Sequence, residues 1–182
     1  MGKKQIIVLN GTSSSGKTSI AKELQTVLEE PYTYIAIDQL AEFLESYLPE
    51  GYTPNKQNED KQLTEAFHFI RPSMVSLFHH TIKTLAMLEH RIIVDHVILD
   101  KEWLEECLGL LADEPVLFVG IYCSIEELER REKERGDRKL GLAKLQLDHV
   151  HQYANYDLEI DTTNNSAREC AKAIKNFLEK SQ

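Results

Sequence analysis

The 182-residue chain is short of cysteine, of basic charge and of long hydrophobic runs. Its three cysteines, Cys107, Cys123 and Cys170, lack metal-ligand spacing, and an odd number does not suit a disulfide framework. We therefore expect reduced thiols that are buried as small apolar side chains. No segment approaches the roughly 20 apolar residues that cross a bilayer, and the N-terminal apolar run is too short for a signal peptide. These absences predict a cytoplasmic protein that does not enter a membrane.

The charge balance excludes further partners. Acidic residues outnumber basic ones by 30 to 21, which gives a formal net charge of −9. Nucleic acids and anionic membranes attract basic surfaces, so we expect neither as a partner. An acidic protein that binds a phosphorylated ligand has to collect lysine and arginine locally, so basic clusters are informative in this chain. The sequence leaves open whether the chain forms a homo-oligomer.

Short apolar runs alternate with longer helical patterns, which is typical of βαβ units around a parallel sheet. The length suits one domain. We predict a single three-layer α/β domain over residues 1–182, with a central five-stranded parallel sheet and helices on both faces. A helical insertion is expected at 49–90 and a lid region at 125–145. The expected strands are 5–9, 32–37, 91–95, 116–122 and 156–160.

Local signals place several helix ends. The first helix should begin near Lys17, and Ser124 and Ser166 have the residue type and context of helix N-caps. Pro72 is expected to open a long helix at its first position, where a proline costs no hydrogen bond. The polar segment 49–60 has two prolines and no periodicity, which favours a loop over a site or a disordered linker.

Residues 11–18 read GTSSSGKT and match the phosphate-loop pattern G-x-x-x-x-G-K-[ST] between a predicted strand and a predicted helix. Such a loop curls its backbone N–H groups around a polyphosphate, and the following helix N-terminus adds partial positive charge. Lys17 can reach the β- and γ-phosphates, while the Thr18 hydroxyl can ligate Mg²⁺. The predicted nucleotide-binding residues are Gly11, Thr12, Ser13, Ser14, Ser15, Gly16, Lys17 and Thr18.

A phosphate loop alone does not choose a function. A GTPase would need an Asn-Lys-x-Asp segment, which the chain lacks, and motors need a longer chain. The chain length and its late arginines favour a small-molecule kinase that uses ATP and Mg²⁺, although a preference for ATP over GTP is left open. The fold expected from these observations is the three-layer P-loop NTPase fold.

Two aspartates follow predicted strands, at the sheet edge where ligands bind in open parallel sheets. We assign Asp38 as the catalytic base that accepts the proton of the acceptor hydroxyl. Asp95 is assigned to the magnesium site with Thr18, and both aspartates are expected to face the substrate. The alternative for each carboxylate is a structural role as a helix N-cap or a loop hydrogen bonder.

The segment ERREKERGDRKLG carries four arginines around a Gly-Asp break. Arg135 and Arg138 flank this break, where a mobile lid would place them, so we assign both to stabilising charge on the transferred phosphoryl group. Arg130 and Arg131 are expected to lie on a solvated helix and to make i,i+4 charge pairs.

His96 directly follows Asp95 and is expected to contact substrate or to hydrogen-bond Asp95. Phe67 and Phe69 fall in the predicted insertion, where they would line an acceptor pocket. The remaining histidine pairs lack cysteine or glutamate partners at metal-ligand spacing, so we predict no resident metal centre from them.

The stretches LNGTSSSGKT, AIDQL, RIIVDHV, RGDR and YDLEIDTT together resemble the chloramphenicol phosphotransferases and their relatives among the P-loop kinases. The resemblance implies a cytosolic enzyme that confers antibiotic resistance by phosphorylating a primary hydroxyl of chloramphenicol with ATP and Mg²⁺. It implies that Asp38 is the base and that Arg135 and Arg138 bind phosphate. It also places the Asp161, Thr162 and Thr163 turn near the adenine.

Alternatives remain at this stage. The acceptor could be another small metabolite, a nucleoside, a nucleotide sugar or a protein hydroxyl. The same phosphate loop could also serve a nucleotide-binding regulator that performs no transfer.

Overall fold

The computed structural model describes residues 5–45, 61–136 and 140–180, with the backbone alone for 44–45 and 61–72. The predicted loop at 49–60 and Arg138 lie outside the described residues, and so do the side chains of Phe67 and Phe69.

Five parallel strands form one sheet in the order β2-β3-β1-β4-β5. The first strand of the chain is therefore central, with Ile6 level with Ile92 on one side and with Val116 on the other. The predicted five-stranded parallel sheet is confirmed, and each strand lies within two residues of its expected position. The strands are β1 (Ile6–Asn10), β2 (Thr33–Ala36), β3 (Ile92–His96), β4 (Val116–Tyr122) and β5 (Leu158–Asp161).

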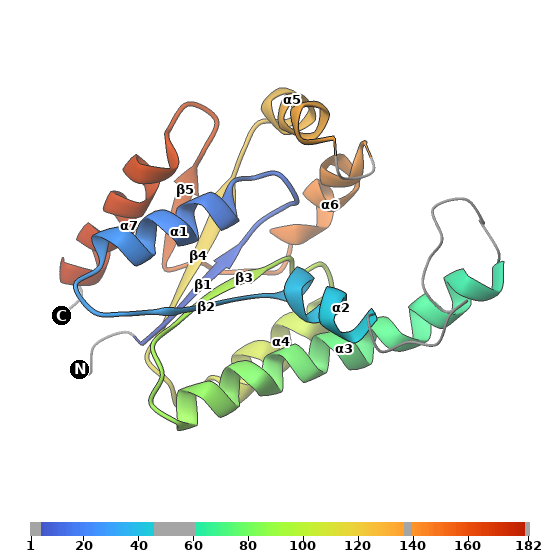
Figure 1. The fold of residues 1–182 in the computed structure, drawn as a ribbon, viewed down its shortest axis with the longest axis horizontal. Coiled ribbons are helices and arrows are strands. Elements are labelled where there is room, and N and C mark those ends of the chain that lie inside the picture. The colour runs from blue at the N-terminus through green and yellow to red at the C-terminus, as the bar shows by residue number, and fades with distance from the viewer. Residues whose placement is uncertain (1–4, 46–60, 137–139, 181–182) are drawn as a thin grey trace.

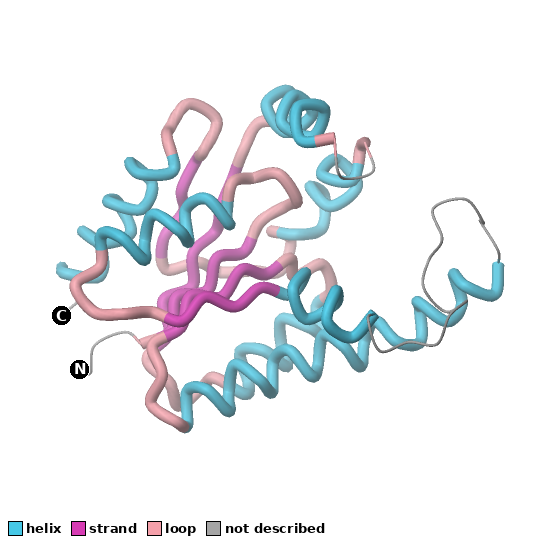
Figure 2. Tube along the Cα trace, in the orientation of Figure 1, coloured by secondary structure: helices cyan, strands magenta, loops and turns pink. Residues whose placement is uncertain are grey.

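Helices cover both faces of the sheet, as Figures 1 and 2 show. One face carries α1 (Lys17–Val27) and α7 (Ala167–Lys180). The opposite face carries α2 (Ile37–Glu45), α3 (Lys61–Met87) and α4 (Lys101–Leu110). Two further helices, α5 (Ile125–Arg135) and α6 (Leu142–Val150), lie beside the loop that follows β1 (Figure 1). The three-layer architecture predicted from the sequence is thereby confirmed.

The strand sequence explains the two-sided core. Successive side chains of a strand point to opposite faces, so Ile6 and Val8 pack toward α3 and α4, whereas Ile7 and Leu9 pack toward α1 and α7. All four side chains are buried. A strand that is covered on both faces has no solvent-facing position, which is why β1 reads as a continuous apolar run rather than an alternating one.

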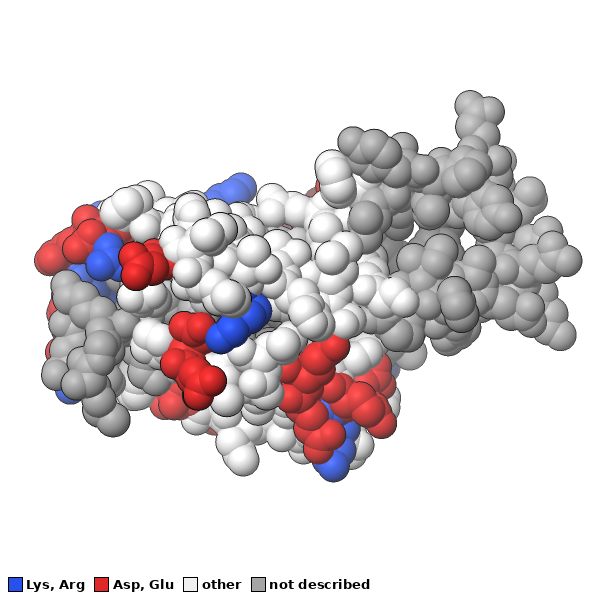
Figure 3. All heavy atoms as spheres, turned by 90° about the horizontal axis from the view of Figure 1, so that it is seen from below, with Lys and Arg blue, Asp and Glu red and all other residues white. Residues whose placement is uncertain are grey.

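The outer surface reflects the acidic composition. Seen from below, the side on which α3 and α4 lie in Figure 1, patches of acidic side chains stand beside only a few basic ones (Figure 3). None of the helices in the described ranges combines the length and apolarity needed to cross a bilayer.

Helix ends test the local predictions. The Ser124 hydroxyl accepts a hydrogen bond from the Glu127 N–H, which confirms it as the N-cap of α5. Ser166 and Glu169 form a reciprocal capping box at the start of α7, with the Ser166 N–H donating to the Glu169 carboxylate at 2.9 Å. The prediction for Pro72 is wrong, because α3 begins at Lys61 and contains this proline in its interior.

An interior proline removes one backbone hydrogen bond and costs about 3 kcal/mol in a helix. The part of α3 beyond the proline buries Val75, Phe78 and Ile82 against the sheet. Burial of side chains this large contributes roughly 1.5–3 kcal/mol each. The packing of the second half of α3 therefore offsets the loss at Pro72, and the same residue type fits either the start or the interior of a packed helix.

Candidate active site

The loop between β1 and α1 owes its shape to two glycines with different constraints. Gly16 has a φ of 94°, in the left-handed region where a side chain is strained. Gly11 is constrained by space, because a Cβ there would lie 2.5 Å from the Ile121 carbonyl oxygen of β4. The first glycine of the motif thus lets the loop approach the sheet, and the second lets the chain turn into α1.

Lys17 folds back over this loop. Its ammonium group donates to the carbonyl oxygens of Gly11 at 2.9 Å and Thr12 at 2.7 Å, and the residue is 6 % exposed. The hydroxyl oxygens of Ser14 and Ser15 are buried and have no hydrogen-bond partner within the described part of the chain. Buried polar atoms normally have a partner, so a lysine and two unpaired hydroxyls at a helix N-terminus fit an anion such as a polyphosphate.

The two residues predicted to hold Mg²⁺ lie together. The Thr18 hydroxyl donates to Asp95 Oδ2 at 2.8 Å, and Lys17 Nζ lies 3.7 Å from Asp95 Oδ1. A carboxylate beside a hydroxyl is an oxygen ligand set of the kind that Mg²⁺ takes in phosphoryl-transfer sites. No group of three histidine, cysteine, aspartate or glutamate side chains suited to a metal ion occurs among the described residues. A metal at this place would therefore need oxygens from water or a ligand as well.

Tyr34 is a further member of this cluster that sequence reasoning missed. Its hydroxyl donates to Asp95 Oδ2 at 3.0 Å from the neighbouring strand β2. Burial and the negative charge of Asp95 raise the pKa of Tyr34, so the phenol stays protonated and remains a donor. The signal was available only through strand order, because β2 and β3 are adjacent in the sheet but far apart in the sequence.

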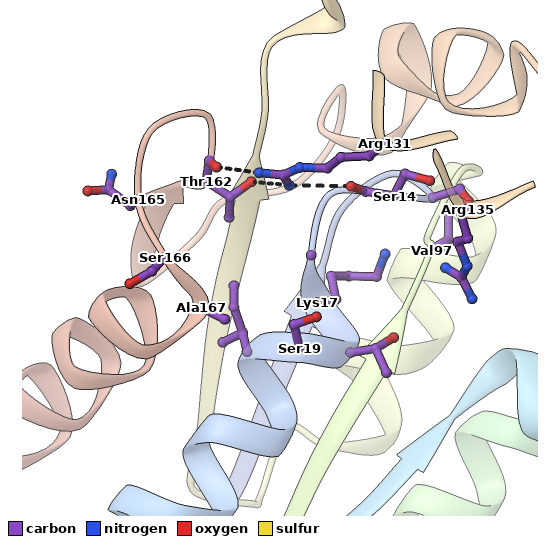
Figure 4. Close-up of a pocket in the computed structure, with 14 residues that line it drawn as sticks. Ser14, Lys17, Ser19, Val97, Arg131, Arg135, Thr162, Asn165, Ser166 and Ala167 are labelled. Carbon is purple, nitrogen blue, oxygen red and sulfur yellow. Dashed lines mark hydrogen bonds between the residues drawn. The ribbon is translucent and has the colours of Figure 1, made fainter. Parts of the chain in front are cut away.

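A cavity of about 350 Å³ opens beside the phosphate loop and extends to the segment between β5 and α7. Lys17 lies in its floor, and Arg131 and Arg135 reach it from α5 (Figure 4). Thr162 and Asn165 form the opposite wall. The cavity therefore joins residues of three predicted groups, namely the phosphate loop, the arginine segment and the turn after the last strand.

The expectation for Arg131 needs correction. Its Nε does donate to Glu127 at 2.7 Å, as the i,i+4 pattern predicts. Its two other nitrogens, however, turn inward and donate to the Ser14 carbonyl at 3.4 Å and the Thr162 carbonyl at 2.7 Å (Figure 4). Arg131 is therefore a pocket residue. The overlooked signal is its position four residues before Arg135, which puts both guanidinium groups on one helix face.

Arg130 behaves as expected, because it is exposed and pairs with Glu127 and Glu134 on the surface of α5. The neighbouring helix α6 also reaches the phosphate loop, since Gln146 Oε1 accepts a hydrogen bond from the Ser13 N–H at 2.6 Å. The phosphate loop is thus contacted from α5 by Arg131, within the predicted lid region 125–145, and from α6 by Gln146, one residue beyond it.

The three residues of the turn predicted to lie near the adenine have two different roles. Thr162 is buried, lines the cavity and donates to the Ser15 carbonyl at 2.8 Å. Asp161 and Thr163 do not line the cavity. Hydrogen bonds from the Thr163 side chain and from the Thr163 N–H lower the pKa of the Asp161 carboxyl, and the Thr163 hydroxyl accepts from the Ser124 N–H. These two residues shape the turn that carries Thr162.

Asp38 lies in the first turn of α2 and is exposed. It does not line the cavity, but its charge contributes to the raised pKa of Tyr34, which contacts Asp95. The prediction for His96 is wrong. Its ring is fully buried and turned away from the cavity, with Nδ1 accepting from the Val97 N–H and Nε2 facing His79.

The parallel sheet, with a phosphate loop after its first strand and basic residues converging on that loop, defines a protein of the P-loop fold. The chain belongs to the chloramphenicol phosphotransferase-like protein family, whose model matches residues 4–179. A provisionally named O-phosphotransferase of Mycobacterium tuberculosis is 34% identical over 186 residues, which cover 96% of this chain and 82% of that protein.

Solved structures show the same fold. The Mycobacterium tuberculosis APS kinase CysC, in complex with AMPPNP and APS, superposes with a TM-score of 0.68 at 19% identity, covering 98% of this chain and 99% of that one. Shikimate kinase from Acinetobacter baumannii, in complex with shikimate, gives a TM-score of 0.67 at 13% identity, covering 98% and 94%. At these identities the likeness concerns the fold.

Proposed function

We propose that this protein transfers the γ-phosphate of ATP to a hydroxyl group of a small molecule, in a reaction that requires Mg²⁺. The observation that carries the proposal is the meeting of Lys17, Thr18 and Asp95 beside the cavity. The family membership supports phosphotransfer, and the APS kinase structure with AMPPNP supports a nucleotide as donor.

The donor half of the site is assigned to the phosphate loop. Its backbone N–H groups and the Ser14 and Ser15 hydroxyls bind the phosphates, while Lys17 and Arg135 neutralise their charge. Thr18 and Asp95 would hold Mg²⁺, and the bound ion would shield the negative charge of the phosphate oxygens. Tyr34 and Thr18 both donate to Asp95 Oδ2, so they fix the direction of that carboxylate.

The acceptor half is assigned to the α2 and α3 side of the site. Asp38 accepts the proton of the attacking hydroxyl as the new phosphate ester forms. Residues 49–90, with Phe67 and Phe69, form the acceptor pocket, and residues 125–145, with Arg138, form a lid over the phosphates. In this proposal both segments belong to a single domain, and the acceptor resembles chloramphenicol in carrying an accessible alcohol.

The direct test is incubation of the purified protein with ATP, Mg²⁺ and a panel of alcohols that includes chloramphenicol, nucleosides and nucleotide sugars. Mass spectrometry should detect a phosphorylated product and an equal amount of ADP. Product from nucleotide sugars alone would replace the proposed acceptor class. Tight nucleotide binding without any product across the panel would instead favour a nucleotide-dependent regulator.

Arg131 provides a second test. Arg131→Ala is expected to weaken binding of a non-hydrolysable ATP analogue by about 10- to 100-fold, because charge-assisted hydrogen bonds contribute about 1.5–3 kcal/mol. The affected contacts join α5 to Ser14 of the phosphate loop and to Thr162 of the cavity wall. Isothermal titration calorimetry gives the dissociation constant.

The matched control is Arg130→Ala, which removes the same side chain from the exposed face of the same helix. Its dissociation constant should stay within about twofold of the unchanged protein. Equal effects of the two substitutions would show that α5 charge in general, rather than the Arg131 contacts, supports binding.

A further inference from the structure

A line of hydrogen-bonded side chains runs beneath the candidate site, outside the cavity, and joins α4, α3 and β3. Glu106 of α4 accepts from the Ser76 hydroxyl at 2.6 Å, and its other oxygen lies 2.5 Å from His79 Nδ1. His79 Nε2 lies 2.8 Å from His96 Nε2. Both rings are buried, with His79 1 % and His96 0 % exposed. The line ends where the Val97 N–H donates to His96 Nδ1 at 2.8 Å.

These contacts permit one arrangement of protons. The Val97 N–H is a donor, so His96 Nδ1 has to be the bare acceptor nitrogen. A ring whose Nδ1 accepts is the neutral imidazole, which carries its single proton on Nε2. That proton points at His79 Nε2, which must be bare in turn. His79 then carries its proton on Nδ1 and donates it to the Glu106 carboxylate. The direction of every bond follows from the backbone donor at one end and the carboxylate at the other.

The end of this line of hydrogen bonds at His96 and Val97 reaches the candidate site. Val97 lines the cavity beside the phosphate loop, and Asp95 precedes the bonded histidine by one residue. The next amide, Ile98 N–H, donates to the Asn10 side chain at 2.9 Å, and Asn10 is the last residue of β1 before the loop. The first two amides after β3 are thus both held by side chains, one through His96 and one through Asn10.

We propose that His79 is a positioning residue for phosphoryl transfer, in that it fixes the tautomer of His96 and thereby holds the backbone that carries Asp95 and Val97. The inference rests on the proposed function, because it assigns Asp95 to the donor site. It also gives α3, which lies within the proposed acceptor segment 49–90, a hydrogen-bonded path to the strand that bears Asp95. If the two histidines served only packing, nucleotide binding would not depend on which end of this line of hydrogen bonds donates.

Replacing the acceptor at the Glu106 end of this line of hydrogen bonds with a donor tests this dependence. Glu106→Lys replaces an acceptor with a donor at a side chain that is 34% exposed, where the charged group can stay at the surface. A donor at this point favours a proton on His79 Nε2, which then opposes the proton on His96 Nε2 and releases the Val97 amide. We expect the dissociation constant for the ATP analogue with Mg²⁺ to rise by at least about tenfold.

Two matched variants isolate the effect. Glu105→Lys makes the same charge change one residue earlier, at an exposed side chain that pairs with Lys101, and should leave nucleotide affinity within about twofold. Glu106→Gln retains an acceptor oxygen for His79 and should restore affinity to within about threefold. Equal affinity of Glu106→Lys and Glu105→Lys would overturn the proposal, and so would a loss in Glu106→Gln as large as that in Glu106→Lys.

A second measurement needs neither substitution nor activity. Long-range ¹H–¹⁵N correlation spectra of the unchanged protein, labelled at histidine nitrogen, report which ring nitrogen carries the proton. We expect Nε2–H for His96 and Nδ1–H for His79, and the opposite tautomer at either ring would overturn the proposal. A failure of the unchanged protein to bind nucleotide would reject the proposed function instead, and these spectra would still decide the direction of the chain.

Discussion

Asp38→Asn is expected to lower the rate of phosphoryl transfer by about 10²- to 10⁴-fold, the range typical of a lost general base. An amide cannot accept the hydroxyl proton, yet it has almost the same size as the carboxylate. Affinity for ATP should remain within about twofold, because Asp38 is exposed and does not line the cavity beside the phosphate loop. Single-turnover rates and analogue titrations separate the two quantities.

The matched control for Asp38 is Glu42→Gln, an exposed carboxylate on the same helix, where transfer should remain within about twofold. An unchanged rate of transfer in Asp38→Asn would show that Asp38 is not the catalytic base. Equal losses of nucleotide affinity and transfer rate would move Asp38 to the donor half of the site.

Lys17→Ala is the second substitution with a large expected effect. It removes the ammonium group that spans the loop carbonyls and lies 3.7 Å from Asp95. In the proposed reaction, charge on the transferring phosphoryl group would lose a buried cation, and removal of one such preorganised donor typically costs about 10²- to 10³-fold in rate. Unlike Asp38→Asn, this substitution should also weaken ATP binding, because Lys17 lies in the floor of the cavity.

Lys22→Ala is the control, since Lys22 lies on the same helix α1 with an exposed side chain and should have an effect within about twofold. Circular dichroism and thermal melting check that Lys17→Ala still folds. A folded Lys17→Ala protein with unchanged transfer would contradict the assignment of this loop to the phosphates.

The elements that follow from local pattern were predictable. The strands buried on both faces are continuous runs of isoleucine, valine and leucine, and Ser124 and Ser166 sit where capping serines are expected. The position of Pro72 inside a helix was not predictable, because a proline at the start of a helix and one inside a well-packed helix have the same local sequence signal. Only the helical backbone of the residues before it, from Lys61 onward, distinguishes the two cases.

The residues of the candidate site likewise include some that the local sequence predicts and some that it does not. The phosphate loop and Asp95 could be placed because a contiguous motif and a strand end define them. Arg131 was missed because its predicted i,i+4 pair with Glu127 is real, and only the inward contacts reveal its second role. Tyr34 and His79 depend on which strands and helices become neighbours, and no short stretch of sequence contains that information.

Gly11 bears on how related chains should be interpreted. Its missing side chain makes room for the Ile121 carbonyl of the adjacent strand, a demand of the fold that persists whether or not a nucleotide binds. A relative that had lost catalysis would still need this glycine, so its retention says nothing about activity. Gly16 meets a different demand of the backbone, because its φ of 94° lets the chain turn into α1. Lys17 meets neither demand, so its substitution in a relative would mark a descendant that keeps the architecture and has abandoned the chemistry.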